Sequence, residues 1–232
     1  MGKRPLSLTI LTIFTGLLLL IASGLVFLYA PLEAEMGQVQ KVFYFHVAST
    51  WTGMLGFLVY AVAGVAYLRT KNITWDIVGV AGVEIGIVFT LVGIISGSIW
   101  ARPIWNTWWT WDPRLTTTTI MELIYAAYFM LRQGIDEPER RARFGAVYAI
   151  IGFLSVPLTF FSIRIFRTIH PVVIGGSDPG ATGSFDMTAR MLQTFMFGLL
   201  TYSFIFATLL WHRIRLGKLS LEIEHKKIEL DE

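Results

Sequence analysis

Six long apolar segments, separated by shorter polar stretches, make up most of the chain. They lie at 8–30, 43–68, 77–99, 117–131, 144–163 and 189–211. An α-helix needs about 17–25 predominantly apolar residues to cross a bilayer. Only the fourth segment is shorter than this, and we expect its helix to begin in the tryptophan-rich stretch before it. The pattern predicts an all-α integral membrane protein, a bundle of six transmembrane helices.

The composition supports a membrane location and excludes several kinds of chemistry. The chain is 54% hydrophobic and 15% charged, whereas a soluble domain carries about 25% charged residues. Cysteine is absent, which excludes disulfides, thiolate metal sites and a cysteine nucleophile. Segment 8–30 is longer than the 7–15 apolar residues, roughly, of a signal peptide, so we expect a retained helix. The net charge of +3 requires no nucleic acid partner.

The distribution of positive charge predicts the orientation of the helices in the lipid bilayer. Of the 19 lysines and arginines, thirteen fall on the side that carries both termini and six on the other. Cytoplasmic loops are enriched in these residues. We therefore expect both termini in the cytoplasm and segment 100–119 outside. The transmembrane domain would cover 1–211, and 212–232 would be a cytoplasmic tail.

Five of the eight tryptophans lie within residues 100–119. They are Trp100, Trp105, Trp108, Trp109 and Trp111. One interpretation is an aromatic belt, since tryptophan favours the membrane–water interface. The other is a flat apolar shelf for a large planar ligand. The density of tryptophans alone does not decide between them.

Two histidines are expected at the same outer face as the tryptophans. His46 begins the second helix and His170 follows the fifth. Each alone would be read as a structural histidine, but two imidazoles beside a planar aromatic shelf are what a six-coordinate haem iron needs. Four further charged side chains are candidate site residues. An arginine can bind an acidic group of a ligand, and an ionisable residue inside a helix can support the site. The four are Arg102, Arg114 and Arg167, which could instead snorkel to headgroups, and Glu122, an ionisable residue inside a helix.

Asp112 and Pro113 are typical of a helix start, because aspartate caps free N–H groups and proline tolerates the first helical position. Asp112 could also pair locally with Arg114. On the third helix, Gly93 and Gly97 have the spacing of close helix packing, and we assign them no further role.

The segment WNTWWTWDPRL at 105–115 resembles the WWD signature of the haem-handling proteins of cytochrome c biogenesis. The size and the two outer histidines are similar to the CcmC family rather than to the longer CcmF and CcsA. Asn106 is a departure, because many longer relatives carry glycine there. The resemblance implies a bacterial inner-membrane protein that binds haem b at its outer face, with His46 and His170 as axial ligands.

The resemblance also implies partners: the haem chaperone CcmE, which receives the haem, the ABC-type pair CcmA and CcmB, and the small subunit CcmD. We expect a haem-transfer factor rather than a conventional enzyme, since no nucleophile–base pair is evident. Two alternatives stay open, a haem-exporting permease subunit and an electron-transfer cytochrome b. The chain has no G-x-x-x-x-G-K-[ST] motif, so ATP hydrolysis would have to come from another chain.

Overall fold

The computed structural model describes residues 4–34, 36–173 and 187–231, and apart from one isolated bridge between Glu33 and Gly37 its regular elements are all helices. They are α1 (Leu6–Gly24) with a π-helical turn η1 (Leu25–Tyr29), α2 (Gln40–Thr70), α3 (Ile73–Trp105), α4 (Pro113–Gln133), α5 (Pro138–Phe153), α6 (Ser155–Ile165) and α7 (Ala189–Asp231). The predicted all-α fold is confirmed.

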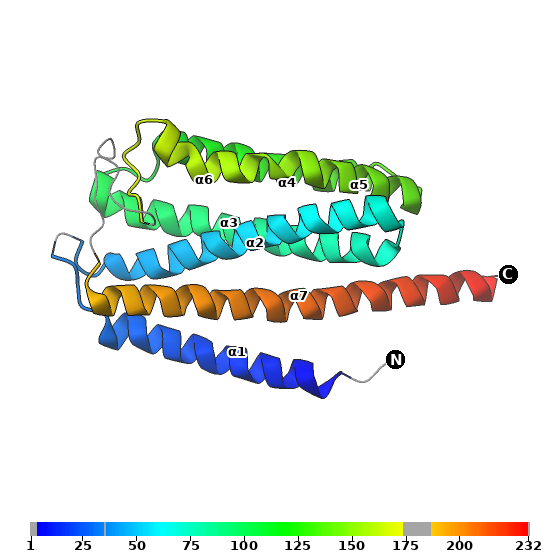
Figure 1. The fold of residues 1–232 in the computed structure, drawn as a ribbon, viewed down its shortest axis with the longest axis horizontal. Helices are drawn as coiled ribbons and strands as arrows, with labels where there is room; N and C mark the ends of the chain where they lie inside the picture. The colour runs from blue at the N-terminus through cyan, green and yellow to red at the C-terminus, as the bar shows by residue number, and fades with distance from the viewer. Residues whose placement is uncertain (1–3, 35, 174–186, 232) are drawn as a thin grey trace.

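Five helical segments in the described part of the chain are long and apolar enough to cross a membrane. They are Leu6–Tyr29, Gln40–Thr70, Ile73–Trp105, Pro138–Ile165 and Ala189–Glu224. The 21-residue helix α4 carries a run of four threonines near its start and lies alongside them (Figure 1). The protein is a multi-pass membrane protein, and these six segments correspond to the six that the sequence predicts.

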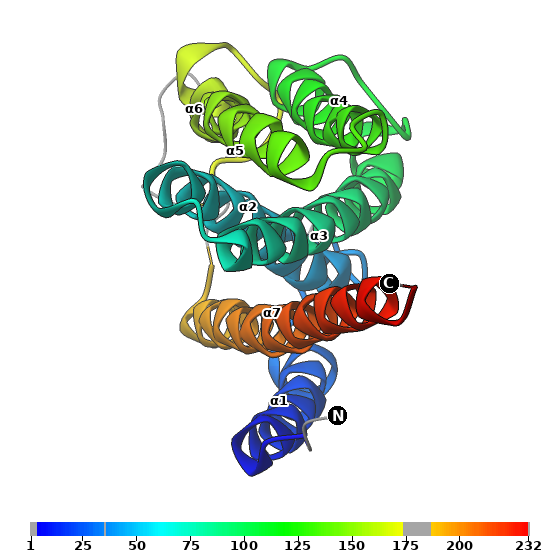
Figure 2. The same cartoon turned by 90° about the vertical axis from the view of Figure 1, so that its right-hand side faces the viewer.

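The helices form layers. Helices α2 and α3 lie side by side in the middle, α4, α5 and α6 cover one side, and α7 followed by α1 covers the other (Figures 1 and 2). The N- and C-termini lie at one end of the bundle (Figure 1). The Trp-rich segment lies at the opposite end, where α3 ends and α4 begins.

The middle layer depends on glycines that let the two helix backbones touch. A Cβ atom added to Gly56 would lie 2.5 Å from the carbonyl oxygen of Gly82, and one added to Gly53 would lie 3.1 Å from that of Gly86. Small residues permit this approach in membranes, where lipid supplies no hydrophobic drive between helices. On α4, Tyr125 packs against this layer, and its ring stacks on Phe57 of α2 at 3.7 Å.

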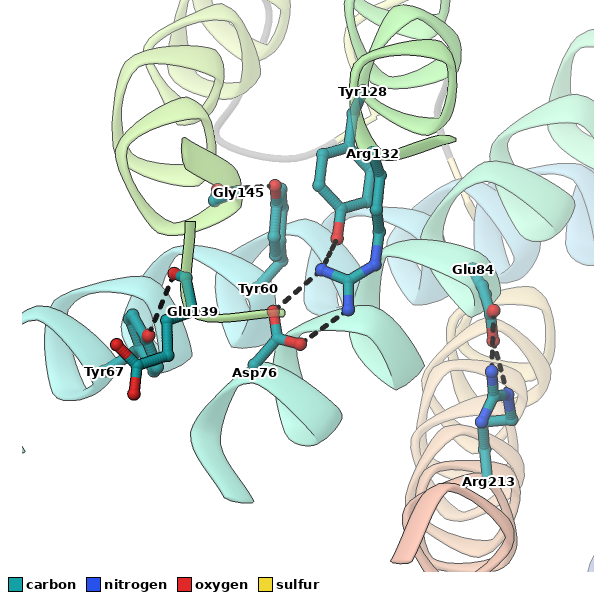
Figure 3. A network of polar contacts seen from close by, with 9 residues as sticks. All are labelled: Tyr60, Tyr67, Asp76, Glu84, Tyr128, Arg132, Glu139, Gly145 and Arg213. Atoms are coloured by element: carbon teal, nitrogen blue, oxygen red, sulfur yellow. Dashed lines mark hydrogen bonds and ion pairs between the residues drawn. The ribbon is translucent and has the colours of Figure 1, made fainter. Parts of the chain in front are cut away.

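Polar contacts tie the layers together at the end that carries the termini (Figure 3). Arg132 of α4 donates two hydrogen bonds to the carboxylate of Asp76 of α3, at 2.5 and 2.8 Å. The Tyr60 hydroxyl of α2 donates to the carbonyl oxygen of Gly145 of α5 at 2.7 Å. A second ion pair joins Arg213 of α7 to Glu84 of α3 (Figure 3).

Three helix boundaries differ from those that the sequence predicts. The fifth segment is divided at Leu154 into α5 and α6. Helix α3 continues through Trp105, so two of the five tryptophans are helical and not part of a loop. Helix α7 runs without interruption past the expected tail boundary at 211/212 to Asp231.

Candidate functional site

A large cavity opens at the tryptophan-bearing end of the bundle. Its volume is about 730 Å³, within the range of about 300–1,000 Å³ for ligand pockets. Its walls come from α2, α3, α4, α6, α7 and the segment after α6, and they are largely apolar. Both candidate histidines line it.

His46 is held by the neighbouring helix. Its Nδ1 lies 2.8 Å from the carbonyl oxygen of Gly93, and because a carbonyl only accepts, Nδ1 carries the proton. Gly97 makes room for the ring, since a Cβ there would lie 2.8 Å from Cε1 of His46. In a neutral ring, Nε2 is then the unprotonated nitrogen that can bind a metal.

His170 has the same arrangement on a segment without regular structure. Its Nδ1 lies 3.1 Å from the carbonyl oxygen of Pro171, and its backbone N–H donates to the Thr168 hydroxyl at 3.0 Å. Burial, together with the positive charge of Arg114, lowers the pKa of His170 to about 3. The imidazole is therefore neutral at physiological pH.

The two imidazoles face one cavity although 124 positions separate them in the chain. Their ring centres lie 6.5 Å apart and their planes are inclined by 45°. Both rings use Nδ1 on a backbone carbonyl. Metal-binding histidines are usually oriented in this way, with the second nitrogen on a carbonyl or carboxylate.

The five tryptophans of segment 100–119 divide into two groups. Trp100, Trp105, Trp108 and Trp109 line the cavity. Trp105 packs edge-on against Trp100, with ring centres 5.3 Å apart, and lies 6.4 Å from His170. Trp111 is not on the cavity wall and is 75% exposed. Four of the tryptophans therefore form an apolar wall beside the histidines.

Arg114 brings a positive charge to the cavity wall. Its side chain donates to the carbonyl oxygen of Thr159 on α6. Among the residues that the structure describes, no carboxylate forms an ion pair with it. A charge in apolar surroundings is stabilised by an opposite charge, so the site suits a ligand with an acidic group.

The remaining predicted site residues do not line the cavity. Arg102 is exposed and donates to the Asn106 side chain, while Arg167 is exposed. Glu122 lies two helical turns beyond Arg114 on the same face of α4, and its Oε2 is buried without a partner in the described part of the chain. Asp112 caps α4, as predicted, and faces the segment that carries His170.

Asn106, the departure from the family pattern, ends α3 in the left-handed conformation with φ of 55°. Glycine favours this conformation and asparagine tolerates it. The Asn106 side chain also accepts a hydrogen bond from Arg102. The substitution therefore fits the turn.

Several contributors to the site were not predicted from the sequence. Gly93 and Gly97 have a visible spacing, but that spacing indicates helix packing and not support of a histidine. Thr168 has no sequence signal. The apolar walls from α6 and α7, such as Phe160 and Met196, could not be told from ordinary lipid-facing residues.

Comparisons with known proteins identify the family of this chain. The family model described as "CcmC: Heme exporter protein C" matches residues 4–229. The chain is 31% identical over 203 residues to "Heme exporter protein C" of Bradyrhizobium diazoefficiens, covering 86% of this chain and 72% of that protein. It is 29% identical to the protein of the same name from Rhodobacter capsulatus over 211 residues, covering 89% and 82%.

A further relative is the "Putative cytochrome c biosynthesis ccmC-like mitochondrial protein" of Marchantia polymorpha. It is 27% identical over 179 residues, which cover 77% of this chain and 73% of the relative. The family model matches over nearly the whole length, and a relative is 31% identical over most of both chains: this chain belongs to the CcmC family.

Proposed function

We propose that this protein binds haem b at the outer end of its bundle and delivers it to the haem chaperone CcmE during cytochrome c maturation. The observation that carries the proposal is the pair His46 and His170, anchored alike through Nδ1 in one apolar cavity. Two imidazoles from different parts of a chain are a common axial ligand set for haem iron.

The spacing of the two rings fits one metal ion between them. A metal–imidazole bond of about 2 Å on each side, with about 1 Å from each nitrogen to its ring centre, separates two ring centres by about 6 Å. The observed separation is 6.5 Å. The separation of the ring centres therefore matches that of two imidazoles on one iron, whose other four ligands a porphyrin would supply.

The cavity wall provides the remaining features that haem binding requires. Trp105, Trp108 and Trp109 offer flat apolar surface to a planar macrocycle. Arg114 offers a buried guanidinium, whose planar donors match a carboxylate. We assign Arg114 to a haem propionate in preference to Arg102 and Arg167, which do not line the cavity.

The proposal includes the membrane orientation and the partners. The positive-inside rule places the cavity outside the cytoplasm, which for a bacterial inner-membrane protein is the side of CcmE. Several relatives are named heme exporter protein. We propose that CcmA, CcmB and CcmD assemble with this chain, and that the ABC-type pair CcmA and CcmB supplies the ATP hydrolysis.

An absorption spectrum of the detergent-purified protein tests the ligand assignment. We expect a bis-histidine haem spectrum in the wild type, and its loss or alteration in both His46→Ala and His170→Ala. His212→Ala is the matched control, because His212 lies far from the cavity and contacts Thr12 of α1. Normal spectra and normal loading of CcmE in both test variants would overturn the assignment.

The tryptophans need a separate test, because an aromatic belt would also place them at this end. We expect the double variant Trp108→Ala/Trp109→Ala to insert into the membrane normally but to retain less haem. Unchanged haem occupancy would favour the belt interpretation. Trp75→Ala is the control, since Trp75 lies at the start of α3 at the opposite end.

A further inference from the structure

The carboxylate of Asp112 does not line the cavity and contacts the segment after α6. The Thr168 hydroxyl lies 2.6 and 2.8 Å from its two oxygens, which share the one hydroxyl proton. The carboxylate also accepts from the backbone N–H of Ile169 and from that of Arg114, each at 2.9 Å. One carboxylate thus joins the start of α4 to a segment 56 positions away in the chain.

Thr168 extends this connection to the backbone of His170. Its side chain is buried, at 3% exposure. The hydroxyl donates its proton to Asp112 and accepts the backbone N–H of His170 at 3.0 Å. Hydrogen bonds in such a chain polarise one another, and the bond to a carboxylate is of the stronger, charge-assisted kind. The position of His170 therefore depends on Asp112 through the Thr168 hydroxyl and through the backbone N–H of Ile169.

The two histidines are held in different ways. His46 lies within α2, and its ring rests on Gly93 and Gly97 of the adjoining helix α3. Moving it would require separating two helices with the most extensive interface in the bundle. His170 lies in a segment without regular structure, between α6 and α7. Its backbone N–H donates to the Thr168 hydroxyl, and its Nδ1 donates to the carbonyl oxygen of Pro171.

We propose that Asp112 and Thr168 are positioning residues that hold His170 as the detachable one of the two haem ligands. This inference rests on the proposed function. A protein that delivers haem must break both iron–imidazole bonds, and a ligand held by a few hydrogen bonds detaches more readily than one held between packed helices. Haem release then begins at His170, while His46 keeps the haem in the cavity.

The test uses the full-length, haem-loaded protein in detergent. Asp112→Asn removes the charge but keeps a good helix cap, and Thr168→Val removes the hydroxyl at nearly equal volume. We expect both variants to show a share of five-coordinate haem. We also expect haem transfer to apomyoglobin to be about tenfold faster than from the wild type. This factor corresponds to the loss of one or two charge-assisted hydrogen bonds.

Two further measurements separate positioning from general damage to the fold. Added imidazole should restore a six-coordinate spectrum in both variants, because it can replace His170 as the iron ligand that has been lost. Thr168→Ser keeps the hydroxyl and should behave as wild type. Thr119→Val is the matched control, since that hydroxyl donates to the carbonyl oxygen of Leu115 within its own helix.

The outcomes distinguish the two proposals. A normal bis-histidine spectrum in the wild type, with Asp112→Asn and Thr168→Val indistinguishable from Thr119→Val, would overturn the positioning role alone. Failure of imidazole to restore the spectrum would do the same. A wild type with no bis-histidine spectrum would overturn the proposed function, and this inference with it.

Discussion

His46 occupies a recess that exists because α3 has no side chains at two positions one turn apart. Gly93 presents its carbonyl oxygen to Nδ1, and Gly97 presents bare backbone to the edge of the ring. The Ser96 hydroxyl, between them in sequence, donates to the Val92 carbonyl at 2.6 Å and approaches the same Nδ1 at 3.5 Å. The orientation of the imidazole is therefore set by residues that have no metal-binding chemistry of their own.

Gly97→Ala tests this dependence. The new Cβ would lie 2.8 Å from Cε1 of His46, so the ring must shift, and we expect haem occupancy to fall several-fold with a changed spectrum. Gly16→Ala is the control, because a Cβ there meets nothing within 4 Å. Wild-type occupancy and spectrum in Gly97→Ala would show that the recess does not orient His46.

A single sequence reveals site residues of a rare and distinctive type. It does not reveal residues that contribute to the site only through their position in the fold. His46, His170 and the tryptophans are conspicuous by chemistry alone. Gly97 and Thr168 are common residue types in a membrane helix or a loop. Their roles come from which atoms the fold places beside them, and that information is absent from a single sequence.

The helices themselves follow their sequence signals closely, with exceptions that have physical causes. Asp112 and Pro113 begin α4 as predicted, with the Asp112 side chain accepting the N–H of Arg114. The fifth segment is interrupted at Leu154 because Pro157 has no N–H to donate to the carbonyl of Phe153. The apolar pattern runs through this site, so hydropathy predicts one helix where the structure has α5 and α6.

The packing of α3 against α4 depends on the ion pair between Asp76 and Arg132. Their side chains are 11% and 19% exposed, and Arg132 also donates to the Tyr128 hydroxyl at 3.2 Å. Asp76→Asn would leave the guanidinium without its charge partner. Removing one partner of a buried pair costs about 3–5 kcal/mol.

We therefore expect Asp76→Asn to lower the thermal unfolding temperature in detergent, as measured by near-UV circular dichroism. Asp136→Asn, at an exposed position between α4 and α5, should leave it unchanged. Equal unfolding temperatures for the two variants would show that this pair does not stabilise the bundle. Repeating this comparison with haem bound would show whether the loss of the ion pair also affects the cavity end of the molecule.

For the whole molecule, the layered order of the helices places every cavity-lining segment at the end away from the termini (Figure 1). The number of apolar segments and the charge bias predict this division into two ends. They do not predict that α6 and α7, which are not sequence neighbours of His46, complete the wall around it. Only the packing of the layers brings them there.

The natural absence of cysteine permits a direct test of orientation. A single cysteine at Arg167, beside the cavity, should react with a membrane-impermeant maleimide in intact cells. One at Gln133, at the end of α4 near the termini, should react only after permeabilisation. The reverse pattern would invert the orientation that the positive-inside rule gives and would place the cavity in the cytoplasm.

The unbroken course of α7 has a mechanical consequence. Its 43 residues correspond to a rod about 65 Å long, with Leu192 and Met196 on the cavity wall near one end and Arg213 joined to Glu84 beyond its middle. Leu192 lies about 32 Å along the helix from this ion pair, so a tilt of α7 by about 3° about the ion pair would move Leu192 by about 1.6 Å. A partner that tilts α7 at its C-terminal end would therefore change the width of the cavity without contacting the cavity itself.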